Sequence, residues 1–136
     1  MISHQYTFRV VYSDTDQMGY VHHSNYAKYY ETARWELFRS LDISYKVIED
    51  SGFLLPVTSL SVKFIKPAFY DQLLTVNTTL KAVRGARMTF SYEIVNEKAE
   101  LINHGETILA FIRKDTRKPC HPPLLVLKAL EDGNLI

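Results

Sequence analysis

The chain of 136 residues lacks the features that several classes of protein require. Its only cysteine, Cys120, has no partner for an internal disulfide, so we expect a cytoplasmic location. No run approaches the ~18 consecutive apolar residues of a membrane-spanning helix, and residues 1–10 lack the pattern of a secretory signal. The formal net charge is only +1. These absences argue against membrane insertion and against broad electrostatic binding to nucleic acid.

The sequence does contain enough apolar material for one core. Apolar residues make up 46% of the chain and charged residues 23%, which is typical of a globular protein. The length fits one domain, and there is no internal repeat, low-complexity segment or linker. We therefore expect residues 1–136 to form a single domain.

A long helix is predicted between Gly19 and Gly52, because no glycine or proline interrupts this stretch. Apolar side chains recur there at spacings of three and four and form one stripe, consisting of Tyr26, Tyr29, Tyr30, Ala33, Leu37 and Leu41. We place the helix at residues 25–41, with Ser24 or Asn25 capping its first turn. The stripe is interpreted as a core surface rather than as a stacking platform for bases.

Strands are predicted on both sides of this helix. Residues 6–12 are rich in aromatic and β-branched side chains. Later runs alternate apolar with polar residues at 60–64, 74–82 and 88–94, while 106–113 is apolar on both faces and 124–130 suggests a short helix. An antiparallel meander supplies the apolar surface that an amphipathic helix needs. The predicted fold class is α+β, with the long helix lying across a curved sheet of about five strands.

The densest group of polar side chains lies in the loop before the helix. The first turn of a helix presents unpaired amides and a partial positive charge, which can stabilise an oxyanion developing on a carbonyl. A nearby carboxylate can act as a general base or as a nucleophile. Asp16 and His23 bracket Gly19, which permits a sharp turn. On the residues alone, the loop is interpreted as a site that polarises a carbonyl and activates water.

Other interpretations of this loop stay open at this point. Asp14 and Asp16 could form Asx turns, and His22 and His23 could simply precede the helix. The same four residues are potential metal ligands, although their spacing matches no recognised metal site. The chain has no G-x-S-x-G motif, and Cys120 lies in a proline-rich tail, so a serine or cysteine nucleophile has little support.

A longer motif is more specific. It reads Tyr12-x-Asp14-Thr15-Asp16-x-x-Gly19-x-Val21-x-His23-x-x-Tyr26, followed by Tyr30-Glu31-x-Ala33-Arg34. It resembles the signature of the hotdog-fold acyl-CoA thioesterases, closest to the hydroxybenzoyl-CoA thioesterase branch and its relatives encoded with the Tol–Pal system. Weaker matches follow at Phe64-x-x-Pro67-Ala68-x-Tyr70-Asp71 and Gly105-Glu106-Thr107. The resemblance implies a hotdog fold, a long helix wrapped by an antiparallel sheet.

The resemblance also implies roles for individual residues. Asp16 matches the catalytic carboxylate of the family, and Tyr12 and His23 match positions associated with its site. The backbone amide of His23 matches the donor that polarises the thioester carbonyl. Glu31 and Arg34 lie three residues apart on the helix and are expected to form an ion pair.

Four further residues are expected to contact the substrate: Gly19 and Val21 in the loop, and Arg84 and Arg87 after the third strand. Some relatives carry a basic run at the latter place, which holds the phosphates of coenzyme A. Here the run reads Arg84-Gly85-Ala86-Arg87, so Arg84 matches one basic position and Arg87 could replace another. A merely solvent-exposed role for these arginines is the alternative.

The expected function is hydrolysis of an acyl-CoA to the free acid and CoA. We expect a homodimer or a homotetramer, since sites in this family form between subunits, and we expect no metal or organic cofactor. Three alternatives remain: hydrolysis of acyl groups on acyl carrier protein, binding of acyl-CoA without catalysis, and a metal-dependent hydrolase that uses Asp16 and His23.

Overall fold

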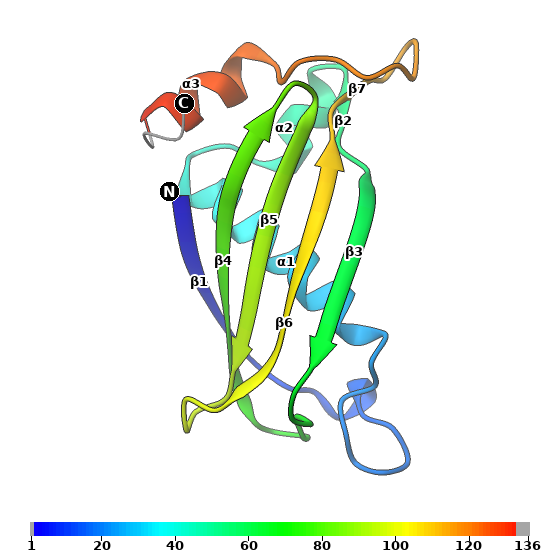
Figure 1. Cartoon of the computed structure of the whole chain (residues 1–136), viewed down its shortest axis with the longest axis vertical. Coiled ribbons are helices and arrows are strands. Elements are labelled where there is room, and N and C mark those ends of the chain that lie inside the picture. The colour runs from blue at the N-terminus through cyan, green and yellow to red at the C-terminus, as the bar shows by residue number, and fades with distance from the viewer. Residues whose placement is uncertain (1, 133–136) are drawn as a thin grey trace.

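The computed structural model describes residues 2–132, in which a five-stranded antiparallel sheet lies over one long helix (Figure 1). The strands are β1 (Ile2–Arg9), β3 (Val57–Phe64), β4 (Leu73–Arg84), β5 (Arg87–Val95) and β6 (Leu101–Ala110). They pair in the order β1-β4-β5-β6-β3, and every pairing is antiparallel. The helix is α1 (Asn25–Ser40). The α+β class and the five-stranded sheet are confirmed.

Smaller elements complete the described chain. A 3-10 turn, η1 (Tyr12–Asp14), follows β1, and α2 (Tyr45–Asp50) follows α1. A second, two-stranded sheet pairs β2 (Phe53–Leu54) with β7 (Ile112–Arg113), and α3 (Leu124–Asp132) comes last. Among residues 2–132, no helix is both long enough and apolar enough to cross a membrane.

The predicted apolar stripe of α1 faces the sheet. Its members Tyr26, Tyr29, Tyr30, Ala33 and Leu37 are buried, and Leu41 packs against the same core while partly exposed. Alternate residues of β4 and β5 form the opposite wall: Leu74, Val76, Leu80, Met88, Phe90, Tyr92 and Ile94. Because side chains alternate across a strand, the outer face of the sheet is left to polar residues.

The start of α1 differs from the expected capped end. Ser24 has helical backbone angles, and its side chain caps no amide of the helix. Its hydroxyl instead forms a hydrogen bond with Nδ1 of His22 at 2.8 Å, while the side chain of Asn25 donates to the carbonyl of Asp14 at 2.8 Å. The predicted cap is therefore wrong, because the preceding loop uses both side chains to hold its own conformation.

Two predicted strand boundaries and one predicted ion pair are also wrong. The first strand is Ile2–Arg9 rather than residues 6–12, since β4 is long enough to pair with it back to Ile2. The run 106–113 is divided between β6 and β7, because the chain changes sheets at the buried Phe111. Glu31 and Arg34 form no ion pair within the described chain, because the guanidinium turns inward under the sheet.

The two edges of the main sheet differ in how they are covered. α1 packs against β1 and β4, and Figure 1 shows it crossing behind the sheet from the end of β3 towards β1. β3 forms the other edge, where Leu60 is 48% exposed and Phe64 is 54% exposed. The helix-facing side of β3 is therefore an uncovered apolar surface.

Candidate active site

The predicted polar loop folds as a small hairpin that leads into α1. Thr15 bridges Val21, and the Asp16 amide donates to the Tyr20 carbonyl at 2.7 Å. Gly19 has a φ of +81°, and its amide donates to the Asp16 carbonyl at 2.9 Å to close the turn. Residues with a Cβ rarely adopt this angle, so glycine is required here. The hairpin holds Asp16 beside the chain that enters the helix.

One carboxylate oxygen of Asp16 fixes the turn and the other is left unbonded. Oδ1 accepts hydrogen bonds from the amides of Met18 at 2.9 Å and Tyr20 at 3.1 Å. Within the described residues, Oδ2 has no hydrogen-bond partner. Asp16 is half-buried and lines a cleft of about 320 Å³. The backbone thus orients the carboxylate through one oxygen and leaves the other without a hydrogen bond.

The cleft lies between this hairpin and the end of β3. Its walls are formed by Asp16, Tyr20, Val21, His23 and Tyr26 on one side and by Phe64, Ile65, Lys66 and Pro67 on the other. The rings of Tyr26 and Phe64 are 5.7 Å apart. Burial raises the pKa of Tyr26, and the nearby Asp16 charge adds to that rise. Tyr26 and Phe64 therefore give the cleft an aromatic surface, on which the Tyr26 hydroxyl stays protonated at neutral pH.

His23 contributes a free backbone amide at the positive end of α1. The amides of Asn25 and Tyr26 donate to the carbonyls of His22 and His23, and the Ser24 amide donates to Nδ1 of His22. Within residues 2–132, the His23 amide donates to no acceptor. The exposed His23 ring stacks on His22 with centroids 4.3 Å apart. The free amide lies at the helix start, which is where the sequence predicts an oxyanion donor.

Asp14 anchors the loop to the helix and takes no part in the cleft wall. Its carboxylate accepts hydrogen bonds from Nζ of Lys28 at 2.9 and 3.1 Å and from the hydroxyl of Tyr29 at 2.7 Å. Burial raises the pKa of Asp14, but these hydrogen bonds and the Lys28 charge outweigh it and the pKa is lowered. In the part of the chain that is described, no three His, Cys, Asp or Glu side chains gather as a metal site.

Val21 and Tyr12 are two further residues expected at the site, and only Val21 lines the cleft. Val21 lines it, and its amide donates to the Ala68 carbonyl at 2.8 Å, which ties the hairpin to the turn after β3. Tyr12 is 72% exposed and packs its ring against Tyr70, outside the cleft wall.

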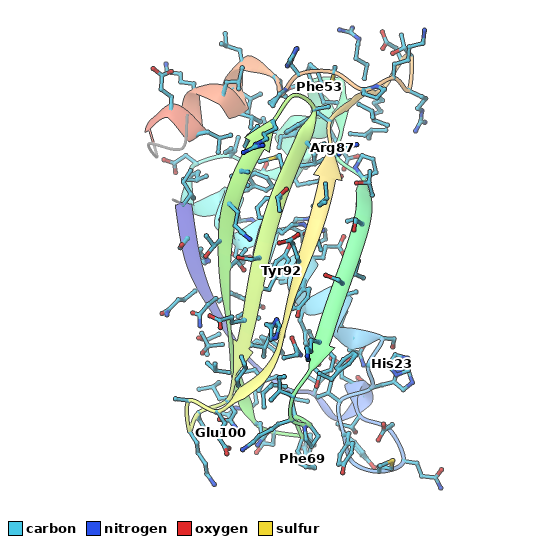
Figure 2. The ribbon with its side chains drawn as sticks, viewed as in Figure 1. His23, Phe53, Phe69, Arg87, Tyr92 and Glu100 are labelled. Carbon is cyan, nitrogen blue, oxygen red and sulfur yellow. The ribbon has the colours of Figure 1, made fainter. Side chains whose placement is uncertain are left out.

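Arg84 and Arg87 lie at the far end of the molecule. They flank the β4–β5 turn and line a separate cavity of about 440 Å³ together with Lys81 and Glu106. Figure 2 shows Arg87 and His23 at opposite ends of the sheet. One copy of the chain therefore does not bring these arginines to the cleft.

Part of the cleft wall was missed by sequence analysis. Because Phe64 continues the alternation of apolar and polar residues in β3, the sequence pattern predicts an ordinary core-facing side chain at this position. The adjacent apolar pair Phe64 and Ile65 breaks that alternation at the end of the strand, and both are about half exposed. This break in period is the signal that could have indicated a binding surface.

Comparisons with known proteins identify the family of this chain. A family model described as the thioesterase-like superfamily matches residues 10–130. The chain belongs to the thioesterase-like superfamily. Among curated members, it is 32% identical over 111 residues to the acyl-CoA thioester hydrolase YbgC of Escherichia coli, a match that covers 82% of this chain and 83% of that protein.

Solved structures give the same family assignment. The DHNA-CoA thioesterase of Staphylococcus aureus superposes with a TM-score of 0.92 at 34% identity, covering 98% of this chain and 92% of the other. The 1,4-dihydroxy-2-naphthoyl-CoA thioesterase of Synechocystis has a TM-score of 0.90 at 28% identity, with 97% and 98% covered. The hotdog fold and the enzyme class, a thioester hydrolase of the acyl-CoA type, are confirmed. The association with the Tol–Pal system stays a prediction.

Proposed function

We propose that this thioesterase hydrolyses its acyl-CoA in the cleft between the hairpin and β3, in the cytoplasm. The observation that carries the proposal is that two residues with an unused polar group line one cleft: His23, whose amide has no acceptor among the described residues, and Asp16, whose Oδ2 has no donor there. The amide donates to the thioester carbonyl and stabilises the negative charge that develops on its oxygen. The carboxylate supplies the base or the nucleophile.

The reaction balances with these two groups alone. Asp16 takes a proton from water as the water oxygen bonds to the carbonyl carbon, and the oxyanion accepts a hydrogen bond from His23. Collapse of this intermediate breaks the C–S bond, and the thiolate of CoA leaves and takes up the proton. Alternatively, Asp16 attacks the carbon directly and water then hydrolyses the anhydride. Both routes use the same free oxygen.

The unpaired edge of β3 supports a homodimer. Two copies related by a two-fold axis pair the same strand with itself in antiparallel sense. This places the Val57 end of the second copy's β3 beside the Phe64 end of the first. Within each sheet, Val57 pairs with Leu109 of β6, and Arg87 pairs with the next residue of β6, Ala110. Val57 and Arg87 therefore lie at the same end of the sheet. This end of the second copy approaches the cleft of the first.

This arrangement gives Arg84 and Arg87 a function that a single copy does not provide. Guanidinium groups bind phosphate through paired charged hydrogen bonds. We propose that these arginines, from the neighbouring copy, hold the phosphates of coenzyme A while its thioester lies against Asp16. Gly19 in the hairpin and Tyr12 in η1 are both exposed, and they are candidates for contact with the bound substrate.

Substitution of Asp16 by asparagine tests the proposal. Asp16→Asn retains the acceptor for the amides of Met18 and Tyr20 but removes the basic oxygen. We expect kcat for acyl-CoA hydrolysis to fall by about 100-fold or more, measured by release of free CoA across straight-chain and aromatic acyl groups. Asp115→Asn, an exposed carboxyl outside the cleft, is the control. Turnover by Asp16→Asn near that of the wild type would refute the assignment.

A further inference from the structure

Tyr26 lines the cleft and carries a hydroxyl that hydrolysis by Asp16 and His23 leaves unused. The residue stands in the first turn of α1 and is only 3% exposed. Within residues 2–132 its hydroxyl has no regular hydrogen bond, and it is not one of the buried side-chain atoms that lack a partner. A polar atom that is neither bonded nor sealed in the core is open to solvent. The small exposed part of Tyr26 therefore includes the hydroxyl, at the cleft that the residue lines.

Two neighbours determine what this hydroxyl can do. Burial raises the pKa of Tyr26, the backbone of Ala68 opposes the rise, and the charge of Asp16 adds to it. The Ala68 amide thus approaches the phenol oxygen without regular hydrogen-bond geometry, while the Asp16 carboxylate is close enough for its charge to act. The hydroxyl stays protonated at neutral pH, and no residue among 2–132 accepts its proton.

Aromatic packing holds the ring of Tyr26 in place. Its centroid lies 5.8 Å from that of Tyr29, with the planes at 85°, and 5.7 Å from that of Phe64. Side chains on an α-helix lean towards its N-terminus, so Tyr26 reaches back to the turn that begins at His23. A ring packed in this way presents its hydroxyl at one place, beside the helix start.

Thioester hydrolysis offers this proton three acceptors: the carbonyl oxygen, the sulfur and the attacking water. The carbonyl oxygen already has the amide of His23 in the proposed site, and divalent sulfur accepts hydrogen bonds only weakly. Water, in contrast, has to be oriented, with one O–H towards Asp16 and one lone pair towards the carbonyl carbon. A hydrogen bond from Tyr26 to the second lone pair completes this orientation.

We infer that Tyr26 is a further catalytic residue, whose hydroxyl holds the attacking water against Oδ2 of Asp16. The inference rests on the proposed hydrolysis in the cleft, and of its two routes it selects direct attack by water. One O–H bond of the water breaks as its proton passes to Asp16, and the water oxygen bonds to the carbonyl carbon. The carbonyl electron pair moves to the oxygen held by His23. The C–S bond then breaks, and the thiolate takes up the proton from Asp16, while Tyr26 keeps its own proton throughout.

Removal of the single oxygen tests this role. Tyr26→Phe keeps the ring that packs on Tyr29 and Phe64, and it breaks no regular hydrogen bond within residues 2–132, so the variant should fold. With the acyl-CoA that the wild type hydrolyses fastest, kcat should fall by about tenfold or more, and KM should change by less than about twofold. Tyr6→Phe removes a hydroxyl from β1, at the sheet edge opposite β3, and should keep the wild-type kcat.

A second nucleophile separates orientation of water from stabilisation of the oxyanion. Hydroxylamine attacks thioesters without a general base and yields a hydroxamate, but its attack also builds an oxyanion beside the amide of His23. After the rate without enzyme is subtracted, the ratio of hydroxamate to free acid should rise by about tenfold or more in Tyr26→Phe. An unchanged ratio, with both products formed more slowly, would assign the hydroxyl to the oxyanion and overturn the inference.

Comparison with Asp16→Asn separates this inference from the proposed function. Loss of hydrolysis in Asp16→Asn, together with wild-type kcat in Tyr26→Phe, would overturn the role of Tyr26 and leave the cleft as the proposed site. Turnover near that of the wild type in both variants would refute the proposed function as well. An effect of Tyr26→Phe on KM alone would show that the hydroxyl contacts the substrate rather than the water, which also overturns the inference.

Discussion

At the scale of single residues, the proposed mechanism divides its two tasks between backbone and side chain. In this proposal the side chain of Asp16 accepts the proton, so the identity of the residue matters. The proposed donor to the oxyanion is the amide of His23, a group that every residue except proline possesses. The exposed imidazole stacks on His22 and makes no hydrogen bond within the described residues. Position 23 is therefore expected to tolerate changes of side chain better than position 16.

This difference can be measured with two variants at position 23. His23→Ala should retain much of the acyl-CoA hydrolysis, whereas His23→Pro removes the amide donor and should lower kcat by about 100-fold or more. Ser24→Pro is the matched control, since Ser24 already has a φ of −63° that proline adopts and the His23 amide is kept. Loss in His23→Ala as severe as in Asp16→Asn would instead assign the role to the imidazole. The comparison requires that circular dichroism shows all variants folded.

At the scale of secondary-structure elements, Asp14 joins the loop that carries Asp16 to α1. Its side chain binds Lys28 and Tyr29 on the helix, and its carbonyl accepts from the amide of His22 and the side chain of Asn25. One residue thus satisfies donors from both elements. The position of the His23 amide relative to Asp16 depends on this junction.

Asp14→Asn should show the strength of the junction through its pH dependence. At pH 7 we expect the unfolding free energy to fall by about 1–3 kcal/mol, because the buried Tyr29 hydroxyl and Lys28 lose a charged acceptor. Folding lowers the pKa of Asp14, so its contribution is complete above about pH 4 and is lost as the pH falls through the folded-state value.

Urea unfolding of wild type and variant from pH 7 to pH 3 provides the measurement. The difference between the two proteins should narrow below about pH 4, where the wild-type carboxylate becomes protonated. Asp50→Asn, which breaks an exposed pair with Lys46, is the control and should change stability little. A difference that stays constant down to pH 3 would show that the charge of Asp14 is not what holds the junction.

The elements that the sequence predicts well are those governed by local periodicity. The stripe of α1 follows from its 3.6-residue period, and β4 and β5 follow from strict alternation. The same alternation in β3 does not reveal that Leu60 and Phe64 are uncovered, because that depends on how far the helix reaches across the sheet. Nor does the spacing of Glu31 and Arg34 reveal that a buried tyrosine hydroxyl competes for the guanidinium.

The site shows the same division between local and distant information. Asp16, Gly19, Val21 and His23 belong to one short loop, so their motif predicts that they lie together. Residues of other segments, Phe64 to Pro67, complete the cleft only after the sheet has formed. Arg84 and Arg87 could not be placed from the sequence, since the proposed contact requires a second copy of the chain.

At the scale of the whole molecule, the proposed shared site makes activity depend on assembly. A lysine at the edge of β3 should oppose pairing of the two edges. We expect Val57→Lys to shift the protein from dimer to monomer in light scattering at micromolar concentration and to lower specific activity in parallel. Leu124→Lys, on an exposed residue of α3, should leave both unchanged. A fully active monomer would contradict the shared site.

The open edge of β3 also has a consequence for biogenesis. Until it is covered, a newly made chain presents unpaired backbone groups next to apolar side chains, a surface that recruits strands of other unfolded proteins as readily as its own copy. High local concentration of identical chains during translation therefore favours correct pairing over aggregation. The yield of active enzyme should consequently be set by the competition between encounter of sister chains and off-pathway association.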